Sequence, residues 1–193
     1  VLYKYNILGA LADIHKRLKQ NIIIELHKME FKLRPWTRSD IESVTRHANN
    51  INILKYMTDG FPNSNDKWKS FIEFAIQDKS ILYLAIEVDG QAVGGIGVSP
   101  KKDVMRKNAE LGYWLSEDYW GQGIMTRAIR EIVTIAFAKF DINRIYATPY
   151  ENNYASHRIL EKVGFVLEAR FEKVVFKNGE LLDELIYAMR RTE

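Results

Sequence analysis

Residues 115–126, with the sequence Leu-Ser-Glu-Asp-Tyr-Trp-Gly-Gln-Gly-Ile-Met-Thr, constrain the fold of this chain more than any other stretch. They join a strand-like run at residues 109–115 to a long helix-like run at residues 124–140. Gly121 and Gly123 allow backbone N–H groups to point outward with no Cβ in the way. The first turn of the helix adds unpaired N–H groups and the positive end of the helix dipole. We therefore expect an anion-binding turn here, suited to a phosphate or a pyrophosphate.

This turn resembles the loop with which the GCN5-related N-acetyltransferases (GNAT family) bind the pyrophosphate of acyl-CoA. The family pattern is Arg/Gln-x-x-Gly-x-Gly/Ala, and the match starts at Trp120 and places Gly123 at the glycine position. Trp120 and Met125 depart from the commonest residues at the two ends. The resemblance implies that backbone groups near Leu115 receive the acetyl and pantetheine arm. It also implies a pyrophosphate site formed by Gly121, Gln122, Gly123, Ile124, Met125 and Thr126.

A second motif follows at residues 152–165, Asn-Asn-Tyr-Ala-Ser-His-Arg-Ile-Leu-Glu-Lys-Val-Gly-Phe. It resembles the family's helix that begins Asn-x-x-Ala/Ser and ends Glu-Lys-x-Gly-Phe. Asn153 heads this helix, where its amide can bond a ligand as well as the backbone; a plain N-cap is the alternative. With the strand at residues 108–115, Asn-Ala-Glu-Leu-Gly-Tyr-Trp-Leu, the three motifs resemble the RimJ/RimL ribosomal-protein acetyltransferase subgroup.

The chain from Met29 onward predicts one α/β (α+β) domain of the GNAT type, with a mixed, largely antiparallel sheet flanked by helices. Asp89-Gly90 and Asn178-Gly179 each indicate a hairpin. Ser39 and Glu42 fit a capping box. Helices are expected at residues 39–47, 50–57, 66–78, 124–140 and 155–163, the last ended by Gly164. Strands are expected at residues 30–36, 81–88, 91–98, 107–115, 143–148, 165–176 and 181–189.

Residues 1–28 differ from the rest and are expected to form an N-terminal extension to the acetyltransferase domain at 29–193. Ile7, Leu11, Ile14 and Leu18 fall at helical spacing. The extension either packs on the domain or on a partner, or is an unimportant leader.

The charge distribution argues against a nucleic-acid partner. The chain has 28 Lys and Arg against 25 Asp and Glu, and residues 1–28 hold five of the former and two of the latter. The remaining residues are therefore neutral overall, whereas nucleic-acid binders concentrate basic charge on the folded domain. No apolar run approaches the roughly 20 residues that span a bilayer, so no membrane partner and a cytoplasmic location are expected.

Acetyl transfer needs a neutral amine and a stabilised leaving thiolate. Many relatives carry a Tyr acid seven residues after the helix Asn, but that position is Leu160 here. Ser156 is the substitute that the subgroup resemblance implies, although it also fits a small polar residue of a first helical turn. Glu110 is the expected base, with an exposed or ion-paired strand Glu as the alternative. The chemistry requires acetyl-CoA as cosubstrate and no metal.

The acceptor is expected to be a primary amine, and the residues expected to bind it are Tyr56, Met57 and Phe61, which lie in a loop-rich stretch. Packing is the alternative role for these side chains, and the favoured one for Trp68. A protein or peptide N-terminus is slightly preferred over a polyamine, an amino acid or an antibiotic amine. A homodimer is left open.

Two other functions compete with this interpretation. Gly121-Gln122-Gly123 partly mimics a dinucleotide-binding fingerprint, but Thr126 stands at the third glycine position and the next strand lacks the ribose-binding acid. A non-catalytic acyl-CoA-binding module would keep the loop and lose turnover, which the missing Tyr allows.

Overall fold

The computed structural model describes residues 14–15 and 29–191. Ile14 and His15 are helical; the rest of the helix expected within residues 1–28 lies outside the described residues. Among the described residues, no helix is long and apolar enough to cross a membrane.

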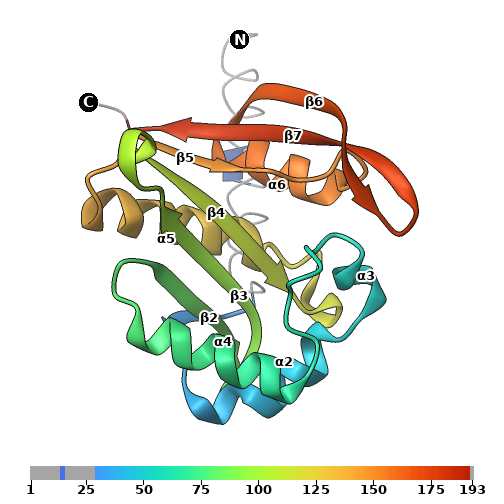
Figure 1. Cartoon of the computed structure of the whole chain (residues 1–193). Coiled ribbons are helices and arrows are strands. Elements are labelled where there is room, and N and C mark those ends of the chain that lie inside the picture. The colour runs from blue at the N-terminus through green and yellow to red at the C-terminus, as the bar shows by residue number, and fades with distance from the viewer. Residues whose placement is uncertain (1–13, 16–28, 192–193) are drawn as a thin grey trace, which may run out of the picture. The chain divides into compact units, whose positions relative to one another are not determined.

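In the part of the chain that the structure describes, seven strands form one sheet in the order β1-β2-β3-β4-β5-β7-β6 (Figure 1). Among these described strands only β4 and β5 run parallel, and every other neighbouring pair is antiparallel. The strands are β1 (Lys32–Pro35), β2 (Leu82–Val88), β3 (Gln91–Pro100), β4 (Asn108–Leu115), β5 (Arg144–Ala147), β6 (Val166–Lys177) and β7 (Glu180–Arg190). The predicted mixed, largely antiparallel sheet is confirmed.

Within residues 29–191, four longer helices flank the sheet: α2 (Ile41–Ala48), α4 (Asn65–Gln77), α5 (Ile124–Lys139) and α6 (Tyr154–Val163). The shorter elements are α3 (Ile51–Leu54) and the 3₁₀ turns η1 (Arg38–Asp40), η2 (Asp103–Met105) and η3 (Glu117–Tyr119). Helices α2 and α4 cover one face, and α5 and α6 cover the other (Figure 1). Each element expected from Met29 onward is present, with bounds shifted by a few residues.

The core on the α2/α4 side is built around aromatic rings. Trp114 of β4 packs on Trp68 of α4, with ring centroids 5.6 Å apart. Gly95 of β3 makes room for this ring, because a Cβ there would lie 2.8 Å from the Trp114 indole nitrogen. Trp68 is 1% exposed, which agrees with the packing role expected for it.

The opposite core rests on α5, whose predicted apolar face is confirmed. Spacing of three and four residues places its apolar side chains on one side of the helix. The buried members of this face are Ile124, Met125, Ala128, Ile129, Ile132, Val133 and Ala136.

Both predicted hairpins are confirmed by their turn geometry. Asp89 and Gly90 have φ values of 48° and 78°, and Asn178 and Gly179 have φ values of 52° and 86°. Two consecutive residues with positive φ define the type I′ turn, whose twist matches that of the flanking strands. The turns therefore fix the β2–β3 and β6–β7 pairings.

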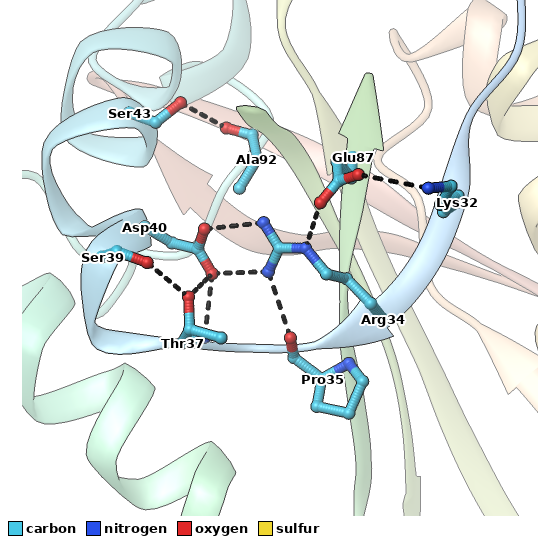
Figure 2. A network of polar contacts seen from close by, with 9 residues as sticks. All are labelled: Lys32, Arg34, Pro35, Thr37, Ser39, Asp40, Ser43, Glu87 and Ala92. Atoms are coloured by element: carbon cyan, nitrogen blue, oxygen red, sulfur yellow. Dashed lines mark hydrogen bonds and ion pairs between the residues drawn. The ribbon is translucent and has the colours of Figure 1, made fainter. Parts of the chain in front are cut away.

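The predicted capping box at Ser39 and Glu42 is wrong. The helical segment begins earlier, at η1, so Thr37 is the N-cap and Asp40 is its partner. The Asp40 carboxylate accepts the Thr37 N–H at 2.8 Å and two bonds from the Arg34 guanidinium at 2.7 Å each (Figure 2). Arg34 also donates to Glu87 of β2, so one partly buried ionic network joins β1, η1 and β2.

Candidate active site

Strands β4 and β5 pair only at their beginnings and then diverge (Figure 1). Their register runs from Asn108 against Arg144 to Glu110 against Tyr146, and there the pairing stops. Strand β4 nevertheless continues, paired with β3, as far as Leu115. Within the described residues, no strand pairs with the β5 side of β4 from Gly112 onward. We call residues 112–115 the open edge of β4.

The open edge presents backbone groups that are free to bind a ligand. Ser116 N–H donates to Val93 carbonyl oxygen of β3 at 2.8 Å. Backbone groups alternate in direction along an antiparallel strand, so Trp114 also faces β3, whereas Tyr113 and Leu115 face the open side. The Leu115 carbonyl is occupied, since it accepts the Trp120 indole N–H at 2.8 Å. Among the described residues, the Leu115 N–H and both backbone groups of Tyr113 are therefore the unpaired groups of the open edge.

The glycine turn leads from this edge to the start of α5. Gly121 and Gly123 have φ values of 75° and 72°, and a Cβ on either would meet no atom within 4 Å. Their left-handed conformation and the open space beside them suit a closely approaching anion. As the N-cap of α5, Gly123 offers no side chain to the first N–H groups of the helix. The residues present thus fit the pyrophosphate of acyl-CoA.

Among the other predicted cofactor residues, Ile124 and Met125 can contribute only backbone. Their side chains are 1% and 6% exposed and belong to the α5 core. Thr126 is half-buried in the first turn of the helix. Gln122 turns back and donates to the Asp118 carbonyl at 3.2 Å.

Contacts that were not predicted from the sequence fix the segment between β4 and the glycine turn. His47 Nδ1 lies 3.0 Å from Ser116 Oγ, and burial lowers the pKa of His47, with nearby Arg46 acting in the same direction. The amides of Asn50 and Asn52, at the start of α3, both bond the Glu117 carboxylate. Because these partners are 65 to 69 residues away in the chain, no local pattern indicates them.

Asn153 and Ser156 lie together at the head of α6. Asn153 Oδ1 accepts the Ser156 N–H at 3.2 Å, so Asn153 is the N-cap of this helix. Ser156 is buried, and its Oγ lies 2.5 Å from the hydroxyl of Tyr113 on β4. Burial raises the pKa of Tyr113 to about 12. Tyr113 was not among the residues expected from the sequence.

Glu110 is the last residue of β4 that pairs with β5, so its side chain lies where the two strands part. Its carboxylate accepts a bond from Lys101 Nζ at 2.5 Å. The Glu110 side chain is 41% exposed, which leaves it accessible to water and to a substrate. Lys101 Nζ also lies 5.7 Å from the centroid of the Tyr146 ring.

Glu110 and Ser156 lie on opposite faces of the sheet. Glu110 shares the face of Trp114, which packs on α4, because side chains two apart in a strand point the same way. Tyr113 points to the other face, where its hydroxyl meets Ser156 of α6. The open edge of β4 lies between the two candidate catalytic groups in this arrangement.

The predicted acceptor residues separate into two environments. The Tyr56 hydroxyl lies 3.4 Å from the Asn152 carbonyl, beside the head of α6. Met57 and Phe61 pack on the aromatic core, and the Phe61 ring lies edge-on to Trp68 at 5.5 Å. The β6–β7 hairpin reaches the same region, since Lys177 Nζ of β6 lies 2.6 Å from Asp59.

A hollow of about 510 Å³ lies away from these residues, beside η1, α2 and the β2–β3 turn. Its walls include Arg34, Asp40 and Glu87, whose side chains are already hydrogen-bonded to one another (Figure 2). We therefore assign the hollow no part in the chemistry.

The family model of the acetyltransferase (GNAT) domain matches residues 30–166 of the chain. The chain belongs to the GNAT acetyltransferase family. As a GNAT protein it is an N-acetyltransferase, in keeping with a Bacillus subtilis relative, the SPbeta prophage-derived uncharacterized N-acetyltransferase YokL. The two are 30% identical over 135 residues, which cover 69% of this chain and 75% of YokL.

Two further comparisons bear on the GNAT fold and its acceptors. The spermidine N(1)-acetyltransferase of Escherichia coli K12 is 26% identical over 155 residues, covering 77% of this chain and 80% of that enzyme. The structure of RimL, a ribosomal L7/L12 α-N-protein acetyltransferase in complex with coenzyme A, superposes with a TM-score of 0.74. It is 23% identical and covers 83% of this chain and 93% of RimL, a likeness that shows the shared fold.

The competing functions receive no support from these observations. A dinucleotide-binding fold requires a mostly parallel sheet, whereas β4 and β5 are the only parallel pair among the described strands. Membership of an N-acetyltransferase family favours an enzyme over a binding module.

Proposed function

We propose that this protein transfers an acetyl group from acetyl-CoA to a primary amine, with a protein or peptide N-terminus preferred. The observation that carries the proposal is the continuity of the open edge of β4 with the glycine turn at the head of α5. A pantetheine arm can add to the open edge through backbone hydrogen bonds while the turn holds the pyrophosphate. Acetyl-CoA, when bound, supplies the acetyl group as a thioester.

Glu110 and Ser156 are the groups that we assign to proton handling. Glu110 would accept a proton from the amine, directly or through water, on the α4 side of β4. Ser156 would donate a hydrogen bond to the sulfur from the α6 side as the carbon–sulfur bond breaks. This division agrees with the placement of the two side chains on opposite faces of the sheet.

The charges near the predicted acceptor residues favour an α-amine over a polycation. The carboxylate of Asp59, which lies between Met57 and Phe61 in the chain, is paired with Lys177. A polyamine with several ammonium groups would need carboxylates that are not already neutralised. RimL is an α-N-protein acetyltransferase, whereas the spermidine enzyme keeps a polyamine as the second candidate.

Two measurements test the proposal. Acetyl-CoA at a hundred times its dissociation constant should stabilise the fold by about 2.7 kcal/mol in thermal denaturation, and NAD should not. Because the chain contains no Cys, a thiol reagent added with acetyl-CoA and a peptide reports only released CoA. No stabilisation by saturating acetyl-CoA would overturn the proposal.

A further inference from the structure

Two hydroxyl groups meet where β5 no longer pairs with β4. Tyr113 Oη, from the open edge of β4, lies 2.5 Å from Ser156 Oγ in the first turn of α6. These residues are 43 positions apart in the chain. Ser156 is 8% exposed, so water competes little for the bond.

The direction of this hydrogen bond decides what Ser156 can do. A hydroxyl carries one proton and two lone pairs, so only one of the two groups spends its proton on the bond. A phenol is a stronger acid than an alkyl alcohol, which makes Tyr113 the better donor and the Ser156 oxygen the better acceptor. Burial raises the pKa of Tyr113 to about 12, so the phenol keeps its proton at neutral pH. The proton of Ser156 then remains free.

The backbone of Ser156 is held as well. Its N–H donates to Asn153 Oδ1 at 3.2 Å, so the first turn of α6 is fixed by its own N-cap. One hydrogen bond fixes the backbone of Ser156 and another occupies a lone pair of its Oγ. The Ser156 O–H bond can therefore point in few directions. Leu160 occupies the position at which many relatives carry a tyrosine acid, and it is fully buried. Tyr113 brings a phenol to the same helix from β4.

We propose that Tyr113 is a positioning residue that donates to Ser156 Oγ and so directs the Ser156 proton toward the sulfur of bound coenzyme A. The inference rests on the proposed acetyl transfer. In that reaction the amine nitrogen bonds to the carbonyl carbon, the carbon–sulfur bond breaks, and sulfur leaves with the electron pair. Glu110 takes the amine proton, and the Ser156 O–H stabilises the departing thiolate by a hydrogen bond.

The ionisation of the bound CoA thiol tests this inference without any acceptor. Because the chain has no Cys, the ultraviolet absorbance of thiolate in the complex belongs to CoA alone. Losing one hydrogen bond to the thiolate should raise the thiol pKa by about one unit. We expect this rise in Tyr113→Phe, an equal rise in Ser156→Ala, and no further rise in the double variant.

Tyr83→Phe is the matched control. Its hydroxyl lies 2.7 Å from Ser99 Oγ, a second Tyr–Ser pair, and its ring packs on Phe71 of the opposite helix layer. This variant should leave the thiol pKa unchanged. In turnover assays, Tyr113→Phe should lower kcat roughly tenfold at an unchanged KM for acetyl-CoA.

The outcomes separate the two proposals. A Tyr113→Phe variant that binds CoA with the wild-type thiol pKa would contradict the inference. If Tyr113→Phe fails to fold, an unchanged thiol pKa in Ser156→Ala, which removes one oxygen, would contradict it equally. If the variants show the expected differences in thiol pKa but the wild type acetylates no amine, the role of Tyr113 would be supported and the proposed function contradicted. A wild type that binds no CoA would overturn both.

Discussion

The carboxylate of Glu110 and the hydroxyl of Ser156 project from opposite sides of one sheet, with the open edge of β4 between them. Glu110 stands on the side of α4, and Ser156 on the side of α6, where it bonds Tyr113. Removal of the amine proton and stabilisation of the thiolate are therefore assigned to groups that do not touch. Their substitutions should affect different steps.

Glu110→Gln should slow acetylation most at low pH. An α-amine has a pKa near 8, so below about pH 8 it must lose a proton before it can attack, and above that pH it is already neutral. General-base catalysis is worth about a hundredfold or more, and that loss should shrink as the pH rises through the amine pKa. Rates measured from pH 6 to about pH 10 check this.

Glu131→Gln, on the exposed side of α5, is the control for charge and should match the wild type. An equal loss at every pH in Glu110→Gln would instead assign Glu110 a structural role through its ion pair with Lys101.

Gly123→Val should abolish acetyl-CoA binding. The φ of 72° makes any side chain strained there by about 1–3 kcal/mol, and the added branch would occupy the open space beside the turn. Gly90→Val is the matched control, since Gly90 has a φ of 78° and equally open surroundings in the β2–β3 turn. Calorimetry should find wild-type affinity in Gly90→Val and none in Gly123→Val. Equal affinities would argue that the pyrophosphate lies elsewhere.

Asp40→Asn should destabilise the fold and reduce its sensitivity to acid. Burial alone would raise the pKa of Asp40, but hydrogen bonds from Arg34 and Thr37 outweigh it and lower that pKa. Stability from this group is therefore present above the unfolded pKa of about 3.9 and is lost as the pH falls through the lower folded value. Urea unfolding at neutral pH should show a loss of about 2 kcal/mol.

Below about pH 4 the free energies of unfolding of the wild type and Asp40→Asn should converge. A constant difference across the whole range would mean that the substitution acts through packing alone.

Local patterns were enough to predict most of the fold. Alternation, helical spacing and two turn sequences indicated the strands, the buried face of α5 and both hairpins, because these depend on neighbours in the chain. The start of α2 was predicted wrongly. Two residue pairs fit a capping box, Thr37 with Asp40 and Ser39 with Glu42. Which pair caps the helix depends on the bonds among Asp40, Arg34 of β1 and Glu87 of β2.

The geometry of the candidate site was predictable where it depends on the local backbone, and not where it depends on contacts between elements far apart in the chain. The glycines of the turn reveal themselves by spacing, whereas the Tyr113–Ser156 bond exists only because β4 and α6 meet in the fold. From the sequence alone, the apolar residues of the loop before α4 fit either substrate binding or core packing. In the structure Phe61 packs in the core, because its ring contacts both Trp68 and Trp114.

Measuring the preference among amine acceptors is the most direct test of the proposed function. Values of kcat/KM should be compared for a peptide with a free N-terminus and no lysine, for Nα-acetyl-lysine and for spermidine. The α-amine, with a pKa near 8 against about 10.4 for lysine, is deprotonated more easily by a carboxylate such as Glu110. We predict the highest kcat/KM for the peptide. A clear preference for spermidine would contradict the account.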